Sequence, residues 1–186
     1  MLSQIKPHFI YNTLGTIERM CLKDPQKAFD LVRNFSLYLR GNFSELNSVT
    51  PIRFAEELKH VEYYVNIEKV RFPDMNIEYD VQSTDFLLPA LSVQPLVENA
   101  IKHGLMRLEE GGKIVIHSYE TQTQFCVEVK DDGGGFDTSL PIEEKKHVRL
   151  SNIRGRLKAM VDGELILESK PGVGTKAAIM IPKEVT

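Results

Sequence analysis

Apolar residues recur at helical spacing over the first part of the chain, from Leu2 to about Phe72. Two breaks interrupt this pattern. Asp24-Pro25 supplies an N-capping aspartate followed by a proline in the first helical position, and Thr50-Pro51 repeats the proline signal. The breaks predict three amphipathic helices, near residues 2–22, 25–45 and 51–71. Because three such helices alone bury a thin core, the pattern favours a bundle that a second subunit completes.

The pattern changes after Pro73. Helical spacing predicts helices at 88–103 and 150–161, the second followed by Gly163 in the C′ position. Alternation of apolar and polar residues predicts strands at 77–81, 113–119, 125–130, 165–168 and 176–181. The order of these elements indicates an α+β fold. A helical segment over residues 1–73 precedes an α/β sandwich with a mostly antiparallel sheet over residues 74–186.

The composition of the chain limits the kinds of molecule or ion that we expect it to bind. The chain has 186 residues, of which 42% are hydrophobic, and its net charge is −3 with the basic residues spread along the sequence. These features give no indication of nucleic acid as a partner. The two cysteines, Cys21 and Cys126, lack CxxC spacing and stand among apolar residues. We therefore expect buried, reduced thiols rather than a disulfide or a zinc site.

Membrane and targeting signals are missing from the sequence as given. The apolar runs fall short of the roughly 20 residues that cross a bilayer, and no signal peptide opens the chain. We expect the chain as given to be cytoplasmic. It begins inside a predicted helix, at Met1-Leu2-Ser3, so we also expect that a further segment precedes it in the full-length protein.

Three segments of the second half carry candidate chemistry. The first contains Asn99 and His103, one helical turn apart on a shared face, and an amide oxygen there is a suitable ligand for Mg²⁺. The second is the glycine-rich turn at 131–136, directly after a predicted strand, and the third is the turn at 172–175. Taken alone, the first segment is equally typical of an ordinary amphipathic helix, and each of the two turns is more often an ordinary loop.

In combination, their order and spacing resemble the Bergerat ATP-binding fold of histidine kinases, type II topoisomerases, mismatch-repair ATPases and heat-shock chaperones. The resemblance implies ATP and Mg²⁺ as cofactors. It implies that Asn99 holds Mg²⁺, that Asp131 accepts a hydrogen bond from the adenine amino group with the help of Thr175, and that residues 137–150 form a lid. The other nucleotide-binding residues implied are His103, Gly133, Gly135, Arg149, Asn152, Gly172 and Gly174.

The first residues of the chain indicate which of these protein families it resembles most. Its run Lys6-Pro7-His8-Phe9-Ile10-Tyr11-Asn12 is similar to the PHFxxN phosphoacceptor motif of LytS-like sensor histidine kinases, and the runs at 68–72, 94–99 and 150–157 are similar to later motifs of that family. A histidine is neutral and nucleophilic near pH 7, because its unperturbed pKa is about 6.5. The resemblance implies a protein-histidine kinase that phosphorylates His8, with Asn12 in reach to fix its tautomer.

The same resemblance implies the partners of the chain. The phosphoryl group would pass from histidine to an aspartate in the receiver domain of a response regulator. The full-length protein would be a homodimer, anchored in the plasma membrane through its upstream region.

Two positions depart from the family pattern and leave alternatives open. Arg149 stands where the family generally has glycine, so it could clamp the phosphates, block the site or belong to a solvated loop. Phe9 follows His8 where many histidine kinases have an acidic base, which leaves Glu98 as one candidate base. A nucleotide-binding pseudokinase or signalling scaffold is therefore the alternative function. The ATPase relatives are disfavoured, because Pro95 replaces the glutamate with which they activate water.

Overall fold

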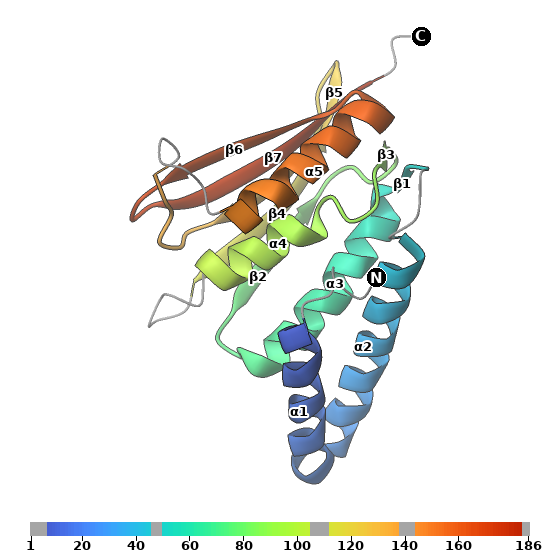
Figure 1. Ribbon diagram of the computed structural model, residues 1–186, viewed down its shortest axis with the longest axis vertical. Coiled ribbons are helices and arrows are strands. Elements are labelled where there is room, and N and C mark those ends of the chain that lie inside the picture. The colour runs from blue at the N-terminus through green and yellow to red at the C-terminus, as the bar shows by residue number, and fades with distance from the viewer. Residues whose placement is uncertain (1–6, 46–49, 105–111, 138–143, 184–186) are drawn as a thin grey trace.

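The computed structural model of the protein describes residues 7–45, 50–104, 112–137 and 144–183. Its first part consists of three helices, α1 (Pro7–Lys23), α2 (Pro25–Glu45) and α3 (Phe54–Arg71). In Figure 1, α1 and α2 form an antiparallel pair that extends away from the rest of the molecule, and α3 leads from this pair toward the sheet.

The first break predicted between these helices is confirmed. Asp24 caps α2, because its Oδ1 accepts the backbone N–H of Lys27 at 3.0 Å. The prediction for the third helix is wrong at its start. Residues Ile52–Arg53 form the short strand β1, paired with β3 (Leu87–Leu88), and α3 begins only at Phe54. A pairing partner distant in sequence thus overrides the helix signal of the local proline.

The buried face of α2 differs from its most apolar stripe. Phe29 and Val32 are 64% and 48% exposed, although they stand at helical spacing with the buried Phe35. The residues that face the core are Ala28, Leu31, Phe35, Tyr38 and Asn42. The helix therefore carries a second apolar stripe that the described chain does not cover.

The second part is built on a five-stranded sheet in the order β2, β4, β5, β7, β6. Its strands are β2 (Asn76–Val81), β4 (Lys113–Glu120), β5 (Gln124–Asp131), β6 (Glu164–Lys170) and β7 (Gly174–Pro182). β2 runs parallel to β4, and the other described pairs are antiparallel. This confirms the prediction of a mostly antiparallel sheet.

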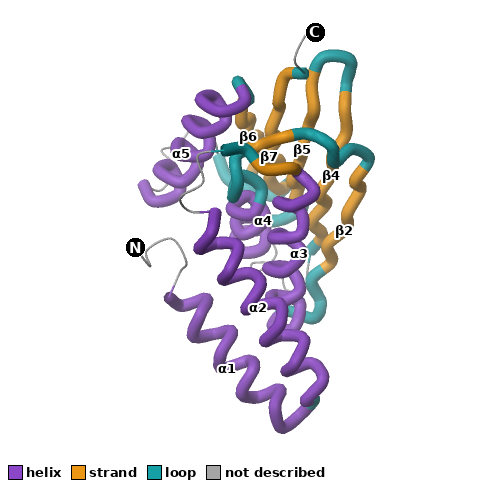
Figure 2. The backbone as a smooth tube through the Cα atoms, turned by 90° about the vertical axis from the view of Figure 1, so that its right-hand side faces the viewer, coloured by secondary structure: helices purple, strands orange, loops and turns teal. Residues whose placement is uncertain are grey.

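The helices lie on one face of this sheet, as Figure 2 shows. They include α4 (Gln94–Asn99), which continues into a π-helical turn at Ala100–Gly104, and α5 (Glu144–Val161). The core lies between these layers and is mostly apolar. Its fully buried side chains include Val97, Ile114, Ile116, Val127, Leu157 and Ile179. Among the described residues, no helix is long and apolar enough to span a membrane.

Two predicted helix boundaries in this part are wrong. The helix expected at 88–103 begins at Gln94, because Leu87–Leu88 pair with β1 and Leu91 takes a left-handed conformation with φ of 55°. The helix expected at 150–161 begins at Glu144. At its end Asp162, with φ of 50°, occupies the left-handed C′ place that Gly163 was expected to fill.

The cysteine prediction is half right. Cys126 is buried, facing away from the helices on β5, whereas Cys21 is exposed near the end of α1.

Candidate nucleotide and phosphoacceptor sites

A buried carboxylate fixes the start of the helix that carries Asn99. Glu57 of α3 accepts the backbone N–H groups of Leu91 at 2.7 Å, Val93 at 2.8 Å and Gln94 at 3.1 Å. Burial raises the pKa of Glu57, and these hydrogen bonds act in the opposite direction. The N–H groups at a helix start have no partner within the helix, so Glu57 both satisfies them and ties α4 to α3.

A pocket opens between α4, the start of α5 and the sheet. Its empty volume is about 390 Å³, part of it open to solvent. Most of its lining is apolar, and polar groups converge from Asn99, Asp131 and Thr175. A mostly apolar cavity with a few placed polar groups is typical of a small-molecule site. The apolar lining residues are Leu96, Ala100, Val129, Phe136, Leu150, Leu167 and Ala177.

Asp131 and Thr175 stand opposite each other in the β5–β7 register. Asp131 is 5% exposed, and its Oδ1 accepts the backbone N–H of Gly133 at 3.1 Å. The Thr175 hydroxyl lies 3.0 Å from that of Ser169 on β6. The structure therefore brings together the carboxylate and the hydroxyl that the sequence placed about forty residues apart. A carboxylate held in this way can accept a hydrogen bond from an amino group in the pocket.

Two glycines allow the turn after β5 to pack on the β6–β7 hairpin. Gly135 has φ of 56°, and a Cβ added there would come within 1.9 Å of the Lys170 carbonyl oxygen. Gly174 has φ of 120°, and its Cβ would come within 2.0 Å of the Asp131 carbonyl oxygen. Both positions thus require glycine for backbone approach, and their effect on the pocket is to hold Asp131 in place.

Other residues of the predicted site lie away from the described pocket lining. Gly172 stands at the exposed tip of the hairpin, and Asn152 is exposed on α5. The backbone of His103 belongs to the π-helical turn, where five-residue hydrogen-bonding changes the register with Asn99, and its side chain lies outside the described residues.

Sequence reasoning missed Ser169. Its hydroxyl accepts the backbone N–H of Phe136 at 2.9 Å and donates to the Gly174 carbonyl at 3.0 Å. It therefore joins the turn after β5 to the hairpin. A serine near a strand end does not indicate this role in the sequence, because the turn after β5 comes close to it only when the sheet has formed.

Arg149 lies near the beginning of α5 and pairs with Glu98 of α4 at 3.2 Å. Its side chain is 34% exposed and that of Glu98 is 8% exposed. The solvated-loop interpretation of Arg149 is therefore wrong. Part of the expected lid, residues 138–143, lies outside the described residues, and 144–150 belong to the helix.

The polar groups that line the pocket fit Mg²⁺ if phosphate oxygens and water supply the rest of its ligands. Asn99 supplies a hard amide oxygen in the lining, and the described residues contain no group of three or more His, Cys, Asp or Glu that could hold a metal ion. Mg²⁺ commonly keeps one or two protein oxygens and takes phosphate oxygens and water for the rest. The site therefore suits Mg²⁺ that arrives with a nucleotide.

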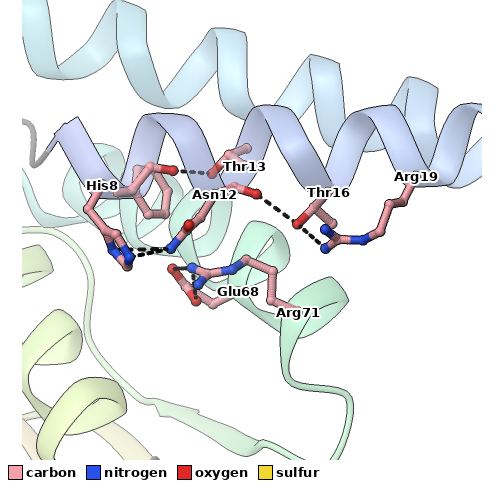
Figure 3. A network of polar contacts seen from close by, with 8 residues as sticks. His8, Asn12, Thr13, Thr16, Arg19, Glu68 and Arg71 are labelled. Atoms are coloured by element: carbon pink, nitrogen blue, oxygen red, sulfur yellow. Dashed lines mark hydrogen bonds and ion pairs between the residues drawn. The ribbon is translucent and has the colours of Figure 1, made fainter.

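The candidate phosphoacceptor stands at the start of α1. His8 is exposed, and the Asn12 amide nitrogen lies 3.1 Å from each of its two ring nitrogens (Figure 3). The next residue, Phe9, is buried and packs on Tyr38 and Tyr64, with ring centroids 5.0 and 5.3 Å apart. Phe9 thus anchors the helix while His8 faces solvent.

An ion pair on α3 lies beside the His8–Asn12 pair, as Figure 3 shows. One guanidinium nitrogen of Arg71 is 2.9 Å from both carboxylate oxygens of Glu68, whose side chain is 4% exposed. Since Phe9 packs on Tyr64 of the same helix, the run at 68–72 singled out from the sequence begins one turn beyond a contact with the phosphoacceptor motif.

Family comparisons cover both parts of the chain. Residues 1–76 match the family described as "Histidine kinase", and residues 88–185 match the family described as "Histidine kinase-, DNA gyrase B-, and HSP90-like ATPase". The chain belongs to the histidine kinase family.

Relatives confirm the predicted LytS-like character. The chain is 36% identical to the putative uncharacterized protein YwpD of Bacillus subtilis, over 96% of this chain and 67% of YwpD. It is 32% identical to the sensor protein LytS of Bacillus anthracis, over 98% of this chain and 33% of LytS. The sensor histidine kinase BtsS of Escherichia coli is 29% identical, over 97% of this chain and 32% of BtsS. The chain thus spans about a third of the length of these two sensors.

Solved structures confirm the fold. The nucleotide-free catalytic domain of histidine kinase ThkA superposes with a TM-score of 0.53 and 21% identity, over 72% of this chain and 95% of that domain. The Acinetobacter baumannii histidine kinase AdeS gives a TM-score of 0.56 and 15% identity, over 95% of each chain. The histidine kinase core is therefore an α+β fold, with helices followed by a Bergerat-type sandwich.

Proposed function

We propose that this chain is the catalytic core of a sensor histidine kinase that transfers the γ-phosphoryl group of ATP to His8. In this proposal residues 1–73 form the phosphoacceptor and dimerisation segment, and residues 74–186 form the ATP-binding domain. One observation carries it. The same chain presents an exposed histidine hydrogen-bonded to Asn12 and a pocket in which Asn99, Asp131 and Thr175 converge.

The pocket residues would bind the two ends of the nucleotide. The Asp131 carboxylate, fixed by the Gly133 amide, accepts a hydrogen bond from the adenine amino group. The Asn99 amide oxygen holds Mg²⁺, which when bound neutralises charge on the phosphates. The apolar lining covers the base and excludes water from it.

The chemistry at His8 needs a neutral imidazole. The lone pair of one ring nitrogen attacks the γ-phosphorus, an N–P bond forms, and the bond to the leaving oxygen of ADP breaks. The other ring nitrogen carries the proton. The Asn12 N–H donates to the ring nitrogen that lacks a proton, so Asn12 biases which nitrogen holds the lone pair, and this hydrogen bond breaks before that lone pair attacks. The phosphoryl group then passes to the aspartate of a response-regulator receiver domain.

The test is incubation with γ-labelled ATP and Mg²⁺, followed by search for acid-labile, base-stable label on the protein. Wild type should be labelled and His8→Gln should not, while nucleotide affinity stays within about threefold, since His8 is not among the residues that line the pocket. His117→Gln, which changes a half-buried histidine on β4, is the matched control and should label normally. Equal label on His8→Gln and wild type would exclude His8.

A homodimer belongs to the same proposal. Six large apolar side chains are exposed on the described part of the first two helices, among them Tyr11 at 73%, Leu14 at 49%, Phe29 at 64% and Val32 at 48%. An apolar surface that a chain leaves uncovered on neighbouring helices suits a second copy packed as a bundle. A plasma-membrane anchor in the full-length protein, which the LytS resemblance implies, completes the proposal.

A pseudokinase is the second candidate, and Arg149 is the observation that favours it. It occupies the usual glycine place and is held by Glu98, the candidate base. Nucleotide binding without acid-labile label would favour this function.

A further inference from the structure

The Arg149 side chain is directed toward the helical part of the molecule. Leu150 lines the nucleotide pocket, whereas Arg149 reaches Glu98 on the neighbouring helix, at 3.2 Å. Its charge also acts on Tyr38 of α2. Burial and the Glu98 carboxylate raise the pKa of Tyr38, and the Arg149 guanidinium lowers it. The guanidinium thus joins α5 to α4, and its charge acts on α2.

A polar cluster surrounds this meeting point, and we call it the junction cluster. Its members are Tyr38 and Asn42 of α2, Gln94 and Glu98 of α4, and Arg149 of α5. The Gln94 side-chain nitrogen, Nε2, donates to the Glu98 carboxylate at 3.3 Å and to the Asn42 side-chain oxygen, Oδ1, at 3.5 Å. Asn42, Gln94 and Glu98 are 7%, 2% and 7% exposed. A polar network buried to this degree depends on each of its members, because an unpaired polar group is costly there.

The junction cluster adjoins both candidate sites. Tyr38 packs on Phe9, the residue after His8, with ring centroids 5.0 Å apart. Glu98 precedes Asn99, and Arg149 precedes Leu150, both of which line the pocket. If bound nucleotide displaces α4 or α5, the cluster should move with them, because its members are next to pocket residues in sequence. The contact between Tyr38 and Phe9 would then pass this movement to the start of α1.

We propose that Arg149 is a positioning residue that ties α4 and α5 to the phosphoacceptor helices, so that nucleotide in the pocket restrains the helix of His8. The inference rests on the proposed function, because it takes the pocket as a nucleotide site. A buried Glu98 carboxylate needs a cation to neutralise it, and Arg149 reaches it from another helix. A glycine at residue 149 could not make this connection. The chain thus replaces the usual lid residue by a charged link to its own helical segment.

Hydrogen exchange tests the link. The probe is MgADP, which occupies the pocket without phosphoryl transfer. In wild type, MgADP should slow amide exchange at the start of α1 and around Tyr38 by about fivefold, the lower end of usual coupling between sites. In the double variant Glu98→Gln/Arg149→Met, which removes both charges at similar volume, MgADP should bind but leave those amides unchanged.

A matched control removes another ion pair. Glu128→Gln/Lys176→Met changes the pair joined at 3.0 Å on the face of the sheet away from the helices, and it should retain the wild-type response. If the Glu98→Gln/Arg149→Met variant binds MgADP and keeps full protection, the inference is overturned. If wild type fails to bind MgADP, the proposed function falls instead.

A second measurement does not depend on nucleotide. Tyr38→Phe and Arg149→Met are compared singly and together by chemical unfolding. Because both act on one cluster, their effects should be non-additive. Additive effects would show that Arg149 makes no energetic contact with α2 and would overturn the inference.

Discussion

The nucleotide pocket and the phosphoacceptor end of α1 are built by opposite means. Constraints on the backbone shape the pocket. They are the β5–β7 register, two glycines with positive φ, and the backbone N–H groups at the start of α4 that donate to the Glu57 carboxylate. The end of α1 presents an exposed His8 above one buried anchor, Phe9. A pocket that binds by shape has to be rigid before its ligand arrives, whereas a nucleophile has to stay accessible. The contrast predicts that mutations in the two regions differ in the size of their effects and in the property that they change: stability, labelling or nucleotide affinity.

The largest effect is expected at Gly174. A Cβ there meets the Asp131 carbonyl oxygen at 2.0 Å, on a backbone with φ of 120°. Gly174→Ala should lower the free energy of unfolding by about 4 kcal/mol or more, because left-handed strain adds to a clash with rigid backbone. Chemical denaturation measures it. Gly134→Ala in the adjoining turn, where a Cβ meets nothing within 4 Å, is the control and should cost about 0.5 kcal/mol or less. Similar losses in both variants would contradict this account.

Phe9→Ala should give the next largest effect. It empties the contact with Tyr38 and Tyr64 and should cost about 3 kcal/mol of stability, as for other buried aromatic truncations. Phe9 does not line the pocket, so calorimetry should find nucleotide affinity changed by about fivefold at most, the size of coupling expected between the two sites. Labelling of His8 should fall, because its helix loses the anchor. A loss of affinity as large as the loss of labelling would show that the two regions are not separable.

Asp131→Asn should act on affinity and leave the fold intact. The amide keeps the shape of the side chain but replaces a charged acceptor of the adenine amine. The loss should be about 1.5–3 kcal/mol, or roughly ten- to a hundredfold in the dissociation constant by calorimetry. Thr123→Ala, in the turn after β4, is a control distant from the pocket. Unchanged affinity would mean that Asp131 does not contact the base.

The smallest effect is expected for the substitution of Arg149, measured as the ratio of ATP to ADP affinity. Since its guanidinium pairs with Glu98, Arg149→Gly should change the ratio of ATP to ADP affinity by less than about twofold. Competition binding with both nucleotides measures this ratio. A selective loss of ATP would support a phosphate clamp, and a selective gain would support a block.

Local signals in the sequence were sufficient for much of this architecture. The alternating strands, the Asp24 cap and the glycine turns before Phe136 and Val173 depend on neighbouring residues, and Asp131 and Thr175 lie together as the motif order implied. Long-range pairing was not predictable in this way. The β1–β3 pair delays the start of two predicted helices, because residues 52–53 and 87–88 meet only in the folded chain.

The same limit applies to the site. Glu57, Ser169 and the Glu98–Arg149 pair act on elements distant from them in sequence, and nothing in their immediate surroundings indicates it. Arg149 is instructive. Its departure from glycine was visible in the sequence, but its direction depends on how α5 packs against α4.

The Glu57 carboxylate also bears on how the protein folds and how it can be divided. Its three backbone donors lie 34 to 37 residues further along the chain, so this contact forms late and couples α3 to α4. A fragment that begins at residue 74 would retain those donors and lose their acceptor. The start of α4 would then fray, and Asn99 with it. We therefore expect the smallest fragment that folds alone and binds nucleotide to include α3.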